Sequence, residues 1–225
     1  MTNTETRIGY SEIRAAMRST LPTGEFGVVS VRPRVISEDE ARASMLYGAM
    51  HGGRGMRQGA GTITALYRHG GLWMSDSVDE MDDHIPFVRR CHEIEAETVL
   101  IGGLGMGMVV TGLCIVPSVR EITVIEIDLA VVALVGPHLT RLVEAAGKKL
   151  TILTGSVFEP KDVLPKDFRF DAAWFDIWQH LSTDNLAEMG ALGRRYSRRC
   201  GFVDHWARDL LKARKRQEDR RYRHW

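Results

Sequence analysis

A glycine-rich turn between two apolar segments constrains the fold of this chain more than any other feature of its sequence. Residues 98–101 read Thr-Val-Leu-Ile, which is typical of a strand buried on both faces. Four glycines follow within six positions: Gly102, Gly103, Gly105 and Gly107. Residues 108–116 are apolar and predict a helix, whose N-terminal N–H groups face the crevice above the strand. The order predicts a strand, a tight turn that a ligand can approach closely, and a helix.

A second predicted strand ends in two acids. Residues 121–128 alternate between polar and apolar side chains and contain Glu126 and Asp128 at their end. In nucleotide-binding α/β folds, a carboxylate at this place, about 20 residues beyond the glycines, binds the ribose hydroxyl groups. Glu126 has about this separation from Gly103. The two segments therefore predict a ligand that contains adenosine, with an ordinary strand–helix–strand unit without a ligand as the alternative.

The spacing of the glycines bears on which ligand this is. Gly103, Gly105 and Gly107 form G-x-G-x-G, whereas nicotinamide and flavin enzymes use G-x-G-x-x-G to hold a pyrophosphate. A nicotinamide oxidoreductase is therefore disfavoured, although the sequence does not exclude it.

Residues 101–107 and 124–128 resemble two motifs of the class I S-adenosylmethionine-dependent methyltransferases, specifically of their spermidine-synthase-like branch. The resemblance covers residues 62–206, and proteins of phages and prophages are similar in the same way. It implies an α/β fold with a Rossmann-like parallel sheet. That fold typically ends with an antiparallel sixth and seventh strand, for which this chain has no room, so we expect five main strands in the order 3-2-1-4-5. It also implies S-adenosylmethionine as the cofactor, with the four glycines around its methionine portion and Glu126 on its ribose.

The ends of the third and fourth predicted strands supply further site residues. Ser156 stands where the family has an aspartate that accepts from the adenine amino group, so we expect this contact from the Ser156 hydroxyl or the neighbouring Val157 backbone. Asp176 ends the fourth strand and is the expected catalytic residue, which orients or deprotonates the acceptor. Trp178 either stacks on the substrate or on adenine, or packs in the core.

Departures from the family pattern disfavour polyamine synthesis. Spermidine synthases carry aspartates at the positions of Gly105 and Gln179, and a cationic amine needs clustered carboxylates for binding and deprotonation. Gln179 remains a candidate substrate contact. His84 falls in a helix that resembles the acidic helix of that branch, and it either contacts substrate or lies on the helix surface.

The N-terminal part predicts a smaller α+β extension over residues 1–93, ahead of an S-adenosylmethionine-binding domain over residues 94–225. Two alternating segments, 62–68 and 72–75, flank His69-Gly70-Gly71 and predict a hairpin. Residues 51–61 contain five glycines and two arginines, and predict a loop that either closes over an anionic substrate or simply lies on the surface.

Composition narrows the class of protein. The three cysteines have no C-x-x-C spacing, which argues against a zinc ribbon and a disulfide framework and favours the cytoplasm. No apolar segment approaches the roughly 20 residues of a membrane span, and residues 1–7 lack the apolar region of a signal peptide. We therefore expect no membrane contact and no bound metal.

Charge is distributed unevenly along the chain. Residues 194–225 contain twelve Lys and Arg against four Asp and Glu, which leaves eighteen basic against twenty-five acidic residues in the rest. A basic C-terminal helix on an acidic body predicts contact with nucleic acid, contact with a second subunit of a homo-oligomer, or a solvated face.

The sequence as a whole predicts an S-adenosylmethionine-dependent transferase, above all a methyltransferase whose acceptor the sequence does not name. The alternative is a non-catalytic module that binds S-adenosylmethionine or a nucleotide and acts through protein or nucleic-acid contacts. A polyamine aminopropyltransferase is the least favoured of the three.

Overall fold

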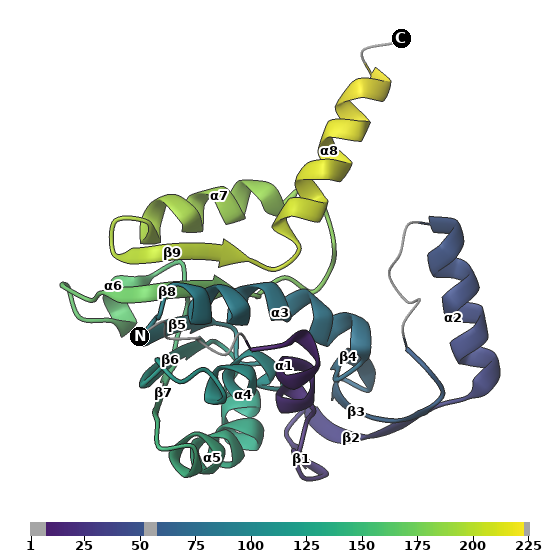
Figure 1. Ribbon diagram of the computed structural model, residues 1–225, viewed down its shortest axis with the longest axis horizontal. Coiled ribbons are helices and arrows are strands. Elements are labelled where there is room, and N and C mark those ends of the chain that lie inside the picture. The colour runs from purple at the N-terminus through teal and green to yellow at the C-terminus, as the bar shows by residue number, and fades with distance from the viewer. Residues whose placement is uncertain (1–7, 52–57, 223–225) are drawn as a thin grey trace, which may run out of the picture.

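The structure is a computed structural model that describes residues 8–51 and 58–222. The strands of these residues form two sheets (Figure 1): an antiparallel sheet in the order β1-β2-β3-β4 and a parallel sheet in the order β7-β6-β5-β8-β9. Numbered along the chain, the parallel strands have the order 3-2-1-4-5, so the predicted α/β architecture is confirmed.

The parallel sheet is made of short strands with buried centres. Its five strands are β5 (Thr98–Gly102), β6 (Glu121–Glu126), β7 (Lys149–Thr154), β8 (Phe170–Phe175) and β9 (Cys200–His205). Neighbouring residues of the central strand β5 point to opposite faces, since Val99 and Ile101 belong to one core cluster and Leu100 to another. The continuous apolar character of residues 98–101 thus reflects burial of both faces.

Helices cover both faces of the parallel sheet. They are α3 (Val78–Glu93), α4 (Met108–Cys114), α5 (Leu129–Ala145), α6 (Pro160–Val163) and α7 (Asn185–Tyr196). The last helix, α8 (Arg208–Tyr222), follows β9 and does not cover the sheet (Figure 1). The Val99 face packs against α3, α4 and α5, whereas the Leu100 face packs against Leu192 and Tyr196 of α7. This arrangement places the carboxyl ends of β5, β6 and β8 together at one edge of the sheet.

The antiparallel sheet precedes this unit in the chain. Its elements are α1 (Tyr10–Met17), β1 (Gly24–Phe26), β2 (Val29–Ile36), α2 (Glu38–His51), β3 (Gly61–Arg68) and β4 (Gly71–Ser75). The predicted hairpin is confirmed: β3 pairs with β4, and the connecting His69 and Gly70 have φ values of 50° and 77°, as a type I′ turn requires. The glycine-rich segment 51–61 falls in part on residues 52–57, which lie outside the described residues.

The two sheets share one core. A single cluster of buried side chains contains Val31 of β2, Leu66 of β3 and Phe87 of α3 together with residues of β5, β6, α4 and α5. The predicted boundary between residues 93 and 94 lies directly after α3, and the division into 1–93 and 94–225 stays a prediction.

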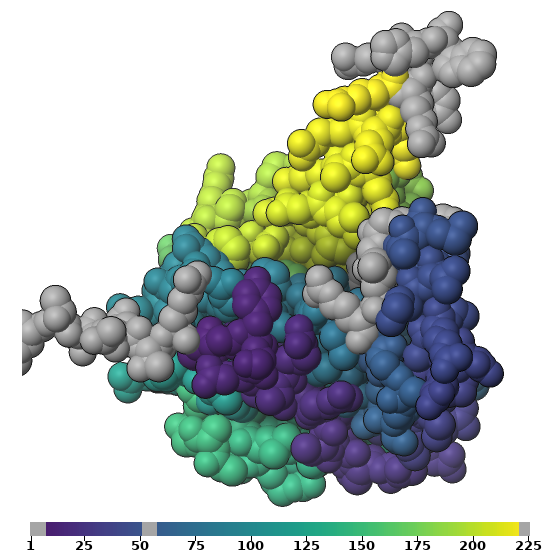
Figure 2. Space-filling view, turned by 45° about the vertical axis from the view of Figure 1, so that its right-hand side comes forward, coloured from purple at the N-terminus to yellow at the C-terminus, as the bar shows by residue number. Residues whose placement is uncertain are grey.

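Two helices stand apart from this core. Helix α8 extends away from the parallel sheet, and α2 lies at the outer side of the antiparallel sheet (Figures 1 and 2). Every residue from Lys212 to Arg220 is exposed, and Leu211 is the last buried residue before them. No helix within the described residues is long and apolar enough to span a membrane.

Candidate functional site

A cavity of about 680 Å³ lies at the carboxyl ends of the parallel strands. This is the edge at which open α/β sheets bind their ligands, and the volume is within the range of small-molecule sites. The structure brings nearly all of the predicted site residues to it: His84, Gly103, Gly105, Gly107, Glu126, Ser156, Val157, Asp176, Trp178 and Gln179. Gly102 does not border the cavity, because it packs beneath the turn against Phe175 and Val157.

The glycine turn is shaped by close packing within the protein. A Cβ atom at Gly103 would lie 2.3 Å from the carbonyl oxygen of Asp176, and one at Gly105 would lie 2.6 Å from the sulfur of Met74. Gly107 would similarly meet Leu139, and these three glycines have positive φ values of 94°, 49° and 75°. The positive φ values favour glycine at each position even without a ligand, and at Gly103 the neighbouring backbone carbonyl also excludes a side chain. The glycine pattern alone is therefore weaker evidence for a ligand than its sequence suggests.

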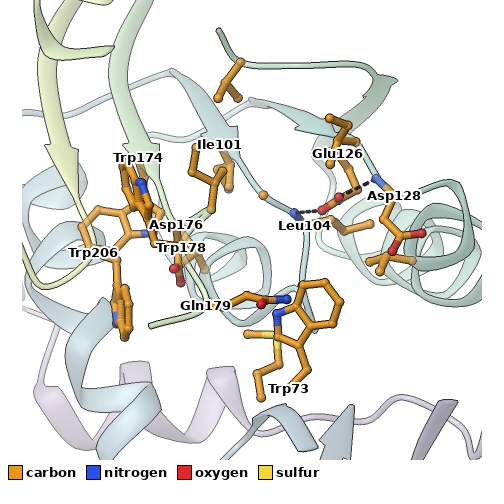
Figure 3. A pocket seen from close by; sticks show the side chains of 18 of the residues that line it. Trp73, Ile101, Leu104, Glu126, Asp128, Trp174, Asp176, Trp178, Gln179 and Trp206 are labelled. Atoms are coloured by element: carbon orange, nitrogen blue, oxygen red, sulfur yellow. Dashed lines mark hydrogen bonds between the residues drawn. The ribbon is translucent and has the colours of Figure 1, made fainter. Parts of the chain in front are cut away.

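Glu126 is fixed at the edge of the cavity by the turn itself. Its Oε2 accepts from the N–H of Leu104 at 2.7 Å, and its Oε1 accepts from the N–H of Asp128 at 2.8 Å (Figure 3). The residue is 8% exposed, so this carboxylate is buried and oriented. Each oxygen has a further lone pair, which allows the carboxylate to accept from two hydroxyl groups of a ligand.

Asp128 connects the two sheets. Its Oδ1 accepts from Ala130 N–H at 2.9 Å and caps α5, while its Oδ2 lies 3.2 Å from the Arg68 guanidinium of β3. The same guanidinium lies over the ring of Trp73, 4.4 Å from its centroid. Arg68 and Trp73 thereby close one side of the cavity with residues of the antiparallel sheet.

The loop after β7 forms another wall. The Ser156 hydroxyl accepts from Phe158 N–H at 3.2 Å and retains its own proton for a ligand. The carbonyl group of Val157 accepts from the buried hydroxyl of Tyr196 at 2.8 Å, and burial raises the pKa of that hydroxyl above its ordinary value. Tyr196 therefore acts as a fixed donor that holds the loop against α7.

Asp176 and His84 form a polar pair on the opposite side of the cavity. His84 Nε2 lies 3.7 Å from Asp176 Oδ2, and the His84 ring meets Trp174 edge-on. His84 is 3% exposed, so the alternative that it lies on the helix surface is wrong. That alternative failed because α3 is buried on the side that carries His84, where it packs on the sheet.

Trp178 and Gln179 follow Asp176 and border the cavity. Trp178 is partly buried and donates from Nε1 to Glu188 Oε2 at 2.8 Å, so its edge is anchored to α7. Gln179 is exposed at the mouth. Both positions are compatible with the predicted substrate contacts, which stay predictions.

Several lining residues were not predicted from the sequence. They include charged, aromatic and large apolar side chains: Arg68, Trp73, Met74, Glu80, Ile127, Trp174 and Trp206. Most of them lie far in the sequence from the predicted site residues. Ile127 is the exception, because it stands between Glu126 and Asp128 and was still not predicted. Tryptophan content is the one available signal, since four of the five tryptophans border this cavity.

The cavity can bind a ligand diol at Glu126 and can accept a proton at Asp176 or His84. Carboxylates outnumber arginines and lysines along its wall: Glu80, Glu126, Asp128 and Asp176 stand against Arg68. Among the described residues, no group of three or more His, Cys, Asp and Glu side chains is arranged to hold a metal ion.

Comparison with known proteins adds a likeness of limited extent. No family model and no curated protein matches the chain. A protein assigned as an O-methyltransferase from Klebsiella pneumoniae shares 17% identity over 53% of this chain and 51% of its own, with a TM-score of 0.39. One assigned as a caffeoyl-CoA O-methyltransferase from Staphylococcus aureus shares 13% over 52% and 51%, with a TM-score of 0.40.

The methyltransferase domain of bacterial CtHen1 shares 22% identity over 43% of this chain and 49% of its own, with a TM-score of 0.36. The matched region thus spans about half the length of each of these proteins. At such identities and TM-scores, the likeness does not decide what this chain binds.

Proposed function

We propose that this chain is an S-adenosylmethionine-dependent methyltransferase. The observation that carries the proposal is the buried Glu126 carboxylate at the end of β6, which two backbone N–H groups hold at the edge of the cavity beside the glycine turn. A diol-binding carboxylate at this place in a parallel sheet is characteristic of nucleoside ligands. The cavity volume and the G-x-G-x-G turn support an adenosyl ligand without a pyrophosphate.

The residues around the cavity divide into two functional groups. Gly103, Gly105 and Glu126 would hold the cofactor, together with Ser156 and Val157 near the adenine ring. S-adenosylmethionine supplies an electrophilic methyl group when bound. Asp176, beside His84, would orient the acceptor and take its proton, while the surrounding aromatic side chains exclude water.

A closer relationship to the spermidine-synthase-like branch, and to phage proteins of that type, rests on the motifs at residues 101–107 and 124–128 alone. The site argues against aminopropyl transfer. Met74 occupies the space that a side chain at position 105 would need, and Gln179 stands in place of the second carboxylate. We also propose a cytoplasmic location, which the three free cysteines support.

The cofactor proposal is tested by changing both the ribose hydroxyl groups of the ligand and the carboxylate of Glu126. Isothermal titration would compare S-adenosylhomocysteine with an analogue that lacks both ribose hydroxyl groups, on the wild type and on Glu126→Gln. We expect the wild type to bind the diol about ten- to hundredfold more tightly, which corresponds to a hydrogen bond with a charged group, and the variant to lose most of this preference.

The matched control is Glu121→Gln, at the exposed start of the same strand, where the side chain pairs with Lys149. It should leave the preference unchanged. Absence of binding to the wild type at millimolar concentration would reject the proposal. Undiminished preference in Glu126→Gln would reject the role of Glu126.

A second role is proposed for α8, as a contact for nucleic-acid phosphates. The supporting observation is that residues 212–220 are exposed throughout, on a helix that carries seven Lys and Arg against three Asp and Glu. If the site binds its ligand without turnover, the chain would act as a binding module through this helix. Formation of S-adenosylhomocysteine from S-adenosylmethionine by the purified protein would argue against that alternative.

A further inference from the structure

Tryptophan is concentrated at the cavity. Trp73 of β4, Trp174 of β8, Trp178 after β8 and Trp206 after β9 all border it, and we refer to them as the tryptophan cluster. Three separate segments of the chain, β4, β8 with the residues after it, and the residues after β9, therefore converge here with the same residue type. Figure 3 shows Trp174, Trp178 and Trp206 near Asp176, Glu126 on the other side of the cavity, and Trp73 and Gln179 below them in this view.

The rings of this cluster are held in fixed orientations. Trp178 donates to Glu188 at 2.8 Å and Trp206 donates to Asp83 Oδ2 at 3.0 Å, so the edges of both indoles are anchored outside the cavity. One face of Trp73 is covered by the Arg68 guanidinium. Because the edges are fixed, these side chains present preformed flat apolar surfaces, which favour a flat aromatic ligand over a flexible or saturated one.

Trp174 adds a polar feature. It is 3% exposed, and its Nε1 has no hydrogen-bond partner among the described residues. A buried donor without an acceptor costs free energy, and a ligand with an acceptor atom at that place would remove the cost.

The charges along the wall restrict the ligand further. Arg68 is the one arginine or lysine among the described residues that border the cavity, and it lies 3.2 Å from Asp128. Asp176, at the tryptophan side, adds a carboxylate close to His84. An anionic ligand would thus meet acidic groups without a compensating cation.

Building on the methyltransferase function proposed above, we infer that the acceptor is a flat aromatic molecule that carries a hydroxyl or amino group and no negative charge. It binds against the tryptophan cluster with this group toward Asp176. In the transfer, the carbon–sulfur bond of the donor breaks and its electron pair stays on sulfur. A lone pair of the acceptor forms the new carbon–oxygen or carbon–nitrogen bond, and the displaced proton passes to the Asp176–His84 pair.

The inference is tested by direct binding, independently of turnover and of cofactor. Isothermal titration and ligand-observed NMR would compare four probes of similar size: a naphthol, an aminoquinoline, a naphthoate and the saturated decahydronaphthol. We expect the first two to bind at least about tenfold more tightly than the last two, because only they are both aromatic and free of negative charge. Tighter binding of the naphthol would indicate a hydroxyl acceptor, and tighter binding of the aminoquinoline would indicate an amino acceptor.

Two variants test whether the aromatic probes bind at the tryptophan cluster. Trp178→Leu should weaken the better aromatic probe by about five- to tenfold, which is the range of one aromatic contact, while binding of S-adenosylhomocysteine stays unchanged. The matched control is Tyr10→Leu, which removes a half-exposed aromatic ring of α1 that lies outside the cavity. Its affinity for every probe should equal that of the wild type.

The outcomes separate this inference from the function on which it rests. Equal binding of the decahydronaphthol would overturn the aromatic requirement, and equal binding of the naphthoate would overturn the charge requirement. If S-adenosylhomocysteine binds but no aromatic probe does, the acceptor class is wrong and the methyltransferase proposal stands. If the aromatic probes bind but S-adenosylhomocysteine does not, the proposed function is wrong.

Discussion

At the scale of single residues, the backbone conformation and packing of the protein account for the glycines of the turn, and no ligand is needed to explain them. The space beside Gly103 is filled by the carbonyl oxygen of Asp176, and the space beside Gly107 by Leu139. The same close approach brings Asp176 next to the turn, where its N–H donates to the carbonyl of Gly102 at 2.9 Å. The turn therefore positions the proposed catalytic carboxylate as well as Glu126 of the proposed cofactor site.

This explanation predicts different costs for two alanine substitutions in the absence of ligand. Gly103→Ala and Gly147→Ala both place alanine at positive φ, 94° and 72°, which costs roughly 1–2 kcal/mol. Only at position 103 would the new Cβ collide with backbone, whereas nothing lies within 4 Å of the Cβ at position 147. In urea denaturation, Gly103→Ala should lose about 1–3 kcal/mol more than Gly147→Ala. Equal losses would contradict the packing explanation.

His205, at the end of β9, predicts a pH dependence of stability. It is 3% exposed and neither ring nitrogen has a hydrogen-bond partner among the described residues. Burial, together with the nearby Arg208 and Lys212, lowers the pKa of His205 to about 4 from an ordinary value of 6.5. The unfolded chain then binds a proton between these pH values that the folded protein does not.

Stability should therefore be complete above pH 6.5 and fall as the pH drops toward 4, by up to about 3 kcal/mol from this group. His205→Phe removes the titrating nitrogens and keeps a ring beside Phe175 and Trp178. The free energy of unfolding of this variant should change less with pH over that interval than that of the wild type. Parallel pH profiles would show that His205 does not cause the loss.

At the scale of elements, α8 differs from the other helices of the parallel sheet because it lacks a buried face beyond its first turn. Leu211 is buried, and the exposed residues after it are mostly charged. A polar helix of this length is marginal in water without tertiary contacts. Its sequence is thus more consistent with a contact surface than with a structural role.

Removal of residues 212–225 should leave the folded body intact and change only its contacts. We expect the Tm to stay within about 2 °C, since surface residues contribute little to stability. Affinity for duplex DNA or single-stranded RNA, measured by fluorescence anisotropy, should fall at least about tenfold, and its dependence on salt should become shallower.

The control for this truncation is the double variant Arg120→Gln and Lys149→Gln. It removes two exposed cations, Arg120 directly before β6 and Lys149 at the start of β7, with side chains 76% and 67% exposed, and leaves α8 unchanged. Nucleic-acid affinity should be retained in this control. A truncated protein that binds as well as the wild type would exclude α8 as the contact surface.

At the scale of the whole molecule, the cavity belongs to both sheets. The parallel sheet supplies Glu126 and Asp176, and the antiparallel sheet supplies Arg68, Trp73 and Met74. The pair between Arg68 and Asp128 and the packing of Met74 on Gly105 connect the two across the cavity. The antiparallel sheet is thus part of the site, and the proposed acceptor would bind between the sheets.

The sequence by itself determined the parallel unit and the position of Glu126 at the edge of its sheet. Strand periodicity, the glycine turn and the acid at the end of β6 are local signals. They carry far because three of the four neighbouring strand pairs of this sheet, all except β5 and β8, are consecutive in the chain. The position of Glu126 at the cavity follows from the same logic, since carboxyl ends of parallel strands meet at one edge.

Only the tertiary structure decided which side chains face that edge from elsewhere. His84, Trp73 and Trp206 lie far apart in the sequence and reach the cavity through packing of α3, β4 and the end of β9. No local pattern encodes such an encounter, because it depends on how buried faces of separate elements fit together in one core. On the proposed acceptor side, local signals therefore placed Asp176, Trp178 and Gln179 at the end of their strand, whereas Trp73 and Trp206 were not predictable from the sequence.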